Sequence, residues 1–180
     1  MSRYELIRWS GLAGDASGVL IIVGAIAAPF VGPVASGTLF VTGHILLFFL
    51  LSGVYVTQSS YAGLLGLLGY VLSTIGNALF IVIQTASSFA LPRIEETGEM
   101  FPAAVPATGI IFSLGLLLFA IANTRVRALP AWAGWLMFAG MALNLALPRL
   151  LTDAPDLVFA IAPVLLGLGA IGFGLGLRRN

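Results

Sequence analysis

The chain has 180 residues, of which 59% are hydrophobic and only 8% charged, and its formal net charge is +1. A soluble domain of this length carries about a quarter charged residues, so the composition excludes a water-soluble fold and predicts an all-α, polytopic membrane bundle. Cysteine and lysine are absent, which excludes disulfides, thiolate chemistry and Schiff-base catalysis. No basic run is longer than the Arg178-Arg179 pair, so nucleic acid is not expected as a partner. The expected partner is the lipid bilayer.

The first predicted helix begins close to the amino terminus. Ser2 and Glu5 have the spacing of a capping box, which satisfies free N–H groups at a helix start. Residues 11–31 then form the first apolar stretch. A basic start followed by a short apolar run also fits a secretory signal peptide, with Ala25-Ile-Ala27 as its cleavage site. We expect this segment to remain in the protein as its first helix.

Five further apolar segments each approach the roughly 20 residues that span a bilayer core. They cover residues 35–56, 61–86, 106–123, 130–148 and 157–177, so residues 1–180 are expected to form one transmembrane domain of about six helices. The Gly32-Pro33 pair should end the first helix, and the polar residues 57–60 should end the second. Pro163 lies inside the last segment, where a proline removes a backbone hydrogen bond and should kink the helix.

The arginines set the expected orientation. With an even number of spans, both termini lie on the same side of the membrane. Placing them in the cytoplasm leaves two arginines outside, Arg93 and Arg149, and six inside, namely Arg3, Arg8, Arg125, Arg127, Arg178 and Arg179. Positive charge concentrates on the cytoplasmic side of membrane proteins. We therefore predict a multi-pass protein of the inner (cytoplasmic) membrane with both termini in the cytoplasm.

The most informative polar residue is His44, the single histidine, because it falls within an apolar segment where ionisable groups are costly and often functional. At 1.5 Å per residue it lies about 13 Å from the outer end of its helix. The next segment carries Ser73, Asn77 and Gln84 on one helical face. Asn144 lies at a comparable outer depth. These five side chains form the candidate ligand-binding site, a polar cavity that opens outward with His44 at its floor.

A structural interpretation of the same residues is favoured over ligand binding. A neutral His, Asn or Gln within a bundle commonly bonds to a neighbouring helix, at about 0.6–2 kcal/mol per contact. Haem or metal ligation is the least favoured interpretation, because a b-type haem usually takes two strong axial ligands and the chain has one histidine. Met137 and Met141 could supply a second ligand but are expected to pack or to face lipid. No cofactor, no metal site and no catalytic residue are therefore predicted.

Asp15 is the only carboxylate within a predicted span. An acidic residue inside a membrane can carry protons, but Asp15 lies about one turn into the first apolar stretch. We expect it at the inner membrane interface, close to Arg8 or to the loop that holds Arg125 and Arg127. The lack of a carboxylate at mid-membrane argues against a proton-coupled transporter.

Glycines recur at spacings that let helices approach closely. Three such patterns occur, namely Gly14 with Gly18, Gly172 with Gly176, and Gly63 with Gly66 and Gly69. They fit either packing within the bundle or docking of the first or last helix on another membrane protein subunit. No nucleotide, phosphate or metal motif and no catalytic serine motif occurs.

Two apolar runs carry a resemblance to a group of known sequences. Gly43-His-Ile-Leu-Leu-Phe-Phe-Leu-Leu-Ser-Gly-Val-Tyr55, followed by Ala62-Gly-Leu-Leu-Gly-Leu-Leu-Gly-Tyr70, resembles uncharacterised small six-span membrane proteins of high-GC bacteria, and Arg8-Trp-Ser-Gly-Leu-Ala-Gly14 is similar in style. The resemblance lies within the first half of the chain. It implies a compact six-helix membrane protein and no particular activity. Asp15 departs from the group, where a small apolar residue is expected.

Two functions follow as hypotheses. The first is an accessory or structural subunit of a larger membrane complex, without catalytic activity of its own, because the chain is small, its loops are short and its glycine-rich helices could contact other subunits. The second is a binding protein or carrier for a small molecule such as a lipid or quinone, with an outward-facing polar pocket around His44. An intramembrane enzyme is the least expected class, because no second catalytic group accompanies His44.

Overall fold

The computed structural model describes residues 2–90, 103–151 and 155–179. Within these residues the chain is helical apart from short turns, and it contains no β-strand. Four continuous helical stretches are long and apolar enough to cross a membrane: Arg3–Phe89, Ala104–Val126, Ala131–Pro148 and Ile161–Arg179. The prediction of an all-α protein with helices suited to a membrane is therefore confirmed.

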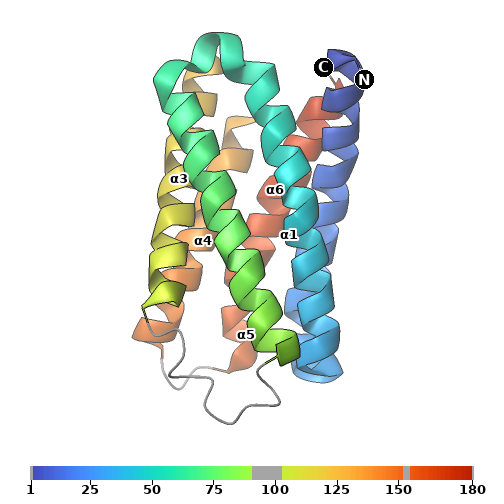
Figure 1. Cartoon of the computed structure of the whole chain (residues 1–180), viewed down its shortest axis with the longest axis vertical. Coiled ribbons are helices and arrows are strands. Elements are labelled where there is room, and N and C mark those ends of the chain that lie inside the picture. Colours follow the sequence, from blue (N-terminus) through green and yellow to red (C-terminus); the bar gives the residue numbers. More distant parts are fainter. Residues whose placement is uncertain (1, 91–102, 152–154, 180) are drawn as a thin grey trace.

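The first helix, α1 (Arg3–Thr85), changes direction twice. Two glycines inside it have non-helical backbone angles, Gly32 (φ 77°, ψ 168°) and Gly63 (φ 55°, ψ −153°). Such angles are open almost only to glycine. The two breaks divide α1 into a first leg (residues 3–31), a second leg (33–62) and a third leg (64–85), which run in alternating directions (Figure 1). A π-helical turn, η1 (Ala86–Ala90), prolongs the third leg.

The predicted capping box at the start of α1 is confirmed. The Ser2 hydroxyl accepts a hydrogen bond from the Glu5 N–H at 3.2 Å, and the Ser2 N–H donates to Glu5 Oε2 at 2.7 Å. The turn expected at Gly32-Pro33 also occurs, because Gly32 takes the backbone angles that end the first leg.

The turn expected at residues 57–60 is wrong, because these residues are helical and the chain turns at Gly63. Hydroxyls in this stretch are satisfied inside the helix. Thr57 Oγ1 donates to the Gly53 carbonyl at 2.8 Å, and Ser59 Oγ donates to the Val56 carbonyl at 3.1 Å. Side chains that bond backward in this way are compatible with a continuing helix, so the polar composition was a misleading signal.

The rest of the chain forms α3 (Ala104–Val126), α4 (Ala131–Leu150), α5 (Asp156–Phe159) and α6 (Ile161–Arg179). Instead of one kinked helix over 157–177, the structure has a break at Ala160 that separates α5 from α6. Pro163 explains the place of this break. It has no N–H to donate to the carbonyl of Phe159, four residues earlier, and its ring crowds that carbonyl.

The helices pack into one elongated bundle with both termini at the same end (Figure 1). α1 packs against α3 and α6, and α4 packs against the same two helices. The third leg and α3 touch backbone to backbone, because an added Cβ on Gly115 would collide with the Ser73 backbone and one on Gly76 with the Phe112 backbone. The completely buried side chains between the helices include Leu47, Leu50, Leu51, Phe112, Phe119, Met137 and Phe173.

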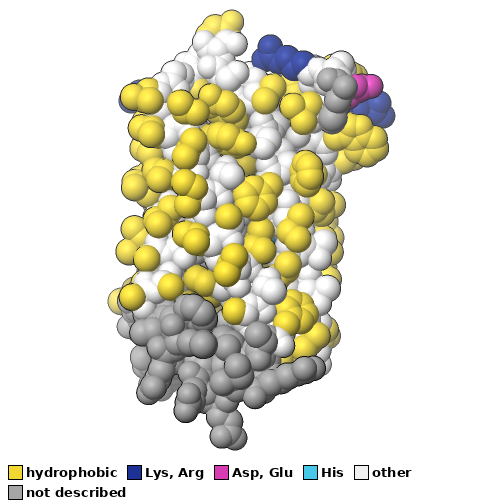
Figure 2. Space-filling model, in the orientation of Figure 1, with side chains coloured by type: hydrophobic (Ala, Val, Ile, Leu, Met, Phe, Trp, Pro, Cys, Tyr) yellow, Lys and Arg dark blue, Asp and Glu magenta, His cyan; other side chains and the backbone are white. Residues whose placement is uncertain are grey.

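Apolar side chains cover the flank of the bundle, whereas arginine side chains appear at the end that holds both termini (Figure 2). The large exposed apolar residues include Phe30, Tyr61, Leu64 and Val82, which are 65–81% exposed. So much exposed apolar surface marks a region of contact with lipid or another apolar partner.

Candidate ligand-binding cavity

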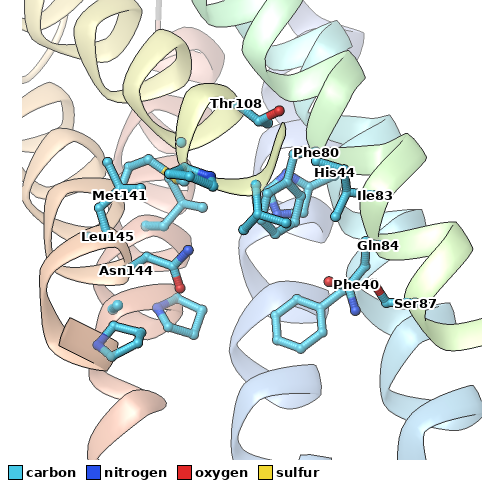
Figure 3. A pocket seen from close by; sticks show the side chains of 18 residues that line it. Phe40, His44, Phe80, Ile83, Gln84, Ser87, Thr108, Met141, Asn144 and Leu145 are labelled. Atoms are coloured by element: carbon cyan, nitrogen blue, oxygen red, sulfur yellow. The ribbon is translucent and has the colours of Figure 1, made fainter. Parts of the chain in front are cut away.

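A cavity of about 500 Å³ lies between the second and third legs of α1, η1, α3, α4 and α6. This volume is within the range of cavities that hold drug-sized ligands. Figure 3 shows Met141 and Asn144 on one side of the space and Phe80, Ile83 and Gln84 on the other. The full lining comprises Phe40, His44, Phe80, Ile83, Gln84, Ser87, Val105, Pro106, Thr108, Gly109, Gly140, Met141, Asn144, Leu145, Pro148, Ala162, Pro163 and Leu166.

His44 lines this cavity and is held from behind by Asn77. His44 Nδ1 lies 2.7 Å from Asn77 Oδ1, and Asn77 Nδ2 donates to the backbone carbonyl of His44 at 2.8 Å. Both residues are almost fully buried, at 1% and 0% exposure. Asn77 does not line the cavity, so it acts as a support for His44 and not as part of the wall.

The two bonds together determine which nitrogen of His44 carries the proton. A backbone carbonyl can only accept, so the Asn77 –NH₂ group must point toward it and the Asn77 oxygen must point toward His44 Nδ1. Nδ1 therefore carries the hydrogen and donates to Oδ1. In the neutral imidazole the other nitrogen, Nε2, then has a free lone pair. Nε2 is the nitrogen left for an occupant of the cavity, as a hydrogen-bond acceptor.

Aromatic rings fix the plane of the imidazole. The ring centroids of His44 and Phe80 are 4.3 Å apart with the planes tilted by 34°, and Phe112 meets His44 edge-on at 6.2 Å. The edge-on arrangement of Phe112 is typical of favourable aromatic pairs, and Phe80 packs directly against the imidazole ring. A ring held by one hydrogen bond at Nδ1 and packed against two aromatic neighbours presents its other nitrogen in one direction.

Two further predicted residues lie in the cavity wall. Gln84 is half-buried, and its Nε2 donates to Ser88 Oγ at 3.1 Å, which leaves its amide oxygen as an acceptor. Asn144 is exposed and reaches the cavity from α4, on the side opposite Gln84 (Figure 3). The polar groups are therefore few and lie in an otherwise apolar wall, as in most sites for amphipathic molecules.

Ser73 lies elsewhere. It is completely buried one turn before Asn77 on the third leg, and its hydroxyl has no hydrogen-bond partner among the described residues. The backbone of α3 at Gly115 packs directly against it. Of the five predicted site residues, the structure thus brings His44, Gln84 and Asn144 to one cavity, places Asn77 behind His44, and leaves Ser73 in a helix contact.

Sequence reasoning missed several apolar members of the wall. Phe40 lies one turn before His44 and Phe80 three residues after Asn77, so helical spacing from the polar residues could have found both. Met141 lines the cavity and Met137 is completely buried, so of the two expected alternatives, packing and contact with lipid, packing is confirmed. Thr108 gave no signal in the sequence.

In the part of the chain that the structure describes, no three His, Cys, Asp or Glu side chains lie together in a way that could hold a metal ion.

Asp15 pairs with a partner that was not expected. Its Oδ2 lies 2.7 Å from a guanidinium nitrogen of Arg178, so the ion pair joins the first leg to the end of α6. The expectation that Asp15 lies at the inner membrane interface, close to Arg8 or to the loop that holds Arg125 and Arg127, stays a prediction. Both members of the pair are partly exposed, at 24% for Asp15 and 39% for Arg178.

The chain matches no protein-family model, no curated protein and no solved structure.

Proposed function

We propose that the chain crosses the inner membrane six times, with both termini in the cytoplasm. Gly32 and Gly63 split α1 into three legs, and each leg exceeds the roughly 20 residues that span a bilayer core. α3, α4 and α6 supply three more crossings. Arginine side chains lie at the end of the bundle that holds both termini (Figure 2). Positive charge favours the cytoplasmic side, which supports this orientation.

Within the bundle, the protein binds an amphipathic small molecule, such as a hydroxyl-bearing lipid or the reduced (quinol) form of a quinone, in the cavity beside His44. The observation that carries this proposal is the His44–Asn77 pair. Both the oxygen and the nitrogen of the Asn77 amide bond to His44, at 2.7 and 2.8 Å. Nε2 of His44 is therefore left as a hydrogen-bond acceptor in a largely apolar space. His44 also lines a cavity of about 500 Å³, which a contact that only joins two helices does not need.

The acceptor defines the chemistry of the ligand. Nε2 with a free lone pair binds a donor, so the ligand carries a hydroxyl or comparable O–H or N–H group. Phe40 and Phe80 beside the imidazole supply apolar contact for a ring or chain attached to that group. A hydroxyl-bearing headgroup on an apolar body is the class that this wall fits best.

A pair of matched probes tests the proposal. 4-Pentylphenol carries the hydroxyl donor, and its methyl ether, 4-pentylanisole, lacks it. Equilibrium dialysis against the protein in lipid nanodiscs, corrected with protein-free nanodiscs, measures both affinities. We expect the phenol to bind about 2- to 10-fold more tightly, as one hydrogen bond of about 0.5–1.5 kcal/mol implies.

Two variants locate the effect. His44→Phe should remove the preference for the phenol, whereas Ser73→Ala, a buried substitution outside the cavity, should keep it. Because His44→Phe leaves Asn77 buried without its partner, the wild-type ratio of the two probes is the primary result. Equal affinities of phenol and ether for the wild-type protein, or binding of neither, would overturn the proposal.

The role of accessory subunit in a larger membrane complex stays a prediction. Two of the glycine patterns that motivated it, Gly14 with Gly18 and Gly172 with Gly176, face neighbouring helices of the same chain. An added Cβ on Gly18 would collide with the Gly167 carbonyl, and one on Gly176 would lie 2.6 Å from the Pro130 ring. Purification from native membranes tests this role, since a subunit should co-migrate with its complex and an independent binding protein should not.

A further inference from the structure

A second hollow adjoins the cavity. It has a volume of about 320 Å³, and its own walls come from the first leg, at Ala25, Ala28 and Pro29, and from the α5–α6 break, at Phe159 and Ala160. Its remaining lining residues, Phe40, Asn144 and Pro163, also line the cavity beside His44. Because the two spaces share three lining residues, they lie next to each other with Phe40 and Asn144 between them.

The second hollow lies at the flank of the bundle. Pro29 and Asn144 are exposed, whereas Ala28 and Ala160 are half-buried. The exposed apolar side chains of Phe30 and Ile161 follow directly along the chain from its walls. In the proposed six-span arrangement this apolar flank faces the bilayer, so the hollow would connect the cavity to lipid.

The local sequence explains why packing is incomplete here. The first leg ends at Gly32, three residues after Pro29, and the helix on the other side is interrupted at Ala160 because Pro163 cannot continue it. Two helices that are interrupted side by side cannot interlock their side chains as regular helices do. The gap is a consequence of prolines and a glycine at fixed places in the chain.

From this continuity we infer that the ligand is a single-tailed lipid alcohol or phenol, whose hydroxyl-bearing headgroup lies beside His44 and whose apolar tail leaves sideways through the second hollow into the bilayer. This inference rests on the proposed function and adds the class of ligand and its route of entry. A ligand that reaches the cavity from lipid needs no opening toward water.

The physics of the bilayer decides what such a tail should do to the affinity. Lipid chains are as apolar as the walls of the hollow, so moving a tail from lipid into the hollow gains little free energy. A long tail should therefore neither weaken nor strengthen binding. A closed cavity of about 500 Å³ predicts the opposite, because a chain too long to be enclosed would be rejected.

The test compares 4-pentylphenol with 4-hexadecylphenol in nanodiscs, with affinities expressed per mole fraction of lipid. We expect the wild-type protein to bind both within about threefold. Ala28→Trp fills the second hollow and should weaken the hexadecyl probe by at least about tenfold while leaving the pentyl probe unchanged. Ala16→Trp, an exposed substitution on the same leg outside both spaces, is the matched control and should change neither.

Each failure has a separate meaning. Rejection of the hexadecyl probe by the wild-type protein, or indifference of both probes to Ala28→Trp, overturns the lateral tail route while the phenol–ether preference of the pentyl probe still supports the proposed function. Loss of that preference overturns the proposed function itself. Ala160→Trp repeats the test from another wall of the second hollow. If both Trp variants abolish binding of both probes, the tail does not follow a path that is separate from the headgroup cavity.

Discussion

Replacing Asn77 by alanine isolates the hydrogen-bond pair at the centre of the candidate site. Asn77 is completely buried, accepts from His44 Nδ1–H at 2.7 Å and donates to the His44 carbonyl at 2.8 Å. Alanine removes both bonds and leaves a buried N–H without its acceptor. Hydrogen bonds between membrane helices average about 0.6 kcal/mol and reach about 1.7 kcal/mol. Two of them predict a loss of about 1–3 kcal/mol in the free energy of unfolding.

Ser73→Ala is the matched control. Ser73 lies one turn before Asn77 on the same leg and is equally buried, but its hydroxyl has no partner among the described residues. Alanine here removes an unpaired polar atom and breaks no bond, so the free energy of unfolding should stay the same or rise. The difference between the two variants measures the bonds and not the loss of polarity.

Reversible unfolding in mixed micelles, with increasing dodecyl sulfate and detection by tryptophan fluorescence, measures both variants, since the chain has three tryptophans. The same samples should show a smaller preference for 4-pentylphenol over its ether in Asn77→Ala, because the tautomer of His44 is no longer held. The reasoning is refuted if Asn77→Ala lies within about 0.5 kcal/mol of the wild type, or if Ser73→Ala destabilises the protein equally.

Three further predictions use the same unfolding titration. Gly115→Ala should lower the free energy of unfolding by about 1–3 kcal/mol or more, because the added Cβ collides with the backbone of the third leg. The control Gly24→Ala, whose Cβ would have neighbours no nearer than 3.2 Å, should lower it by less than about 1 kcal/mol. Equal losses would contradict the tight contact at Gly115. Gly63→Ala should cost about 1–3 kcal/mol although nothing lies within 4 Å, because its φ of 55° is strained for alanine; an unchanged stability would disprove the turn. Asp15→Asn and Arg178→Gln should couple by up to about 1 kcal/mol in a double-mutant cycle, and less at high salt, because the pair is partly exposed; additive effects would argue against the ion pair.

The helical architecture could be predicted because its signals are local. A run of about 20 apolar residues can be recognised without knowing the rest of the chain, and Gly32-Pro33 combines a flexible residue with a helix breaker. The turn at Gly63 was not predictable in the same way. Three glycines recur there, and only Gly63 takes a positive φ, while Gly69 is used for close contact with the Phe119 backbone. Tertiary packing selects between them.

The candidate site could likewise be predicted only as far as its signals are local. His44 stands out because it is the single histidine in an apolar segment, and spacing from Asn77 places Gln84 on the same face. The rotation of the second leg against the third is a tertiary property, so the sequence could not distinguish Asn77 as the support of His44 from Ser73 as a helix contact. The second hollow depends on where two helices are interrupted side by side, which only the assembled bundle shows.

Nitrogen NMR of the imidazole tests the central claim most directly, because the chain has one histidine and ¹⁵N-histidine labelling reports on His44 alone. The protein is prepared with a histidine-free affinity tag in nanodiscs. The account predicts one protonated nitrogen, Nδ1, and one unprotonated nitrogen, Nε2. On addition of 4-pentylphenol the Nε2 signal should shift and the Nδ1 signal should stay, while the methyl ether changes neither. A protonated Nε2 in the free protein, or an Nε2 signal that ignores the phenol, contradicts the account.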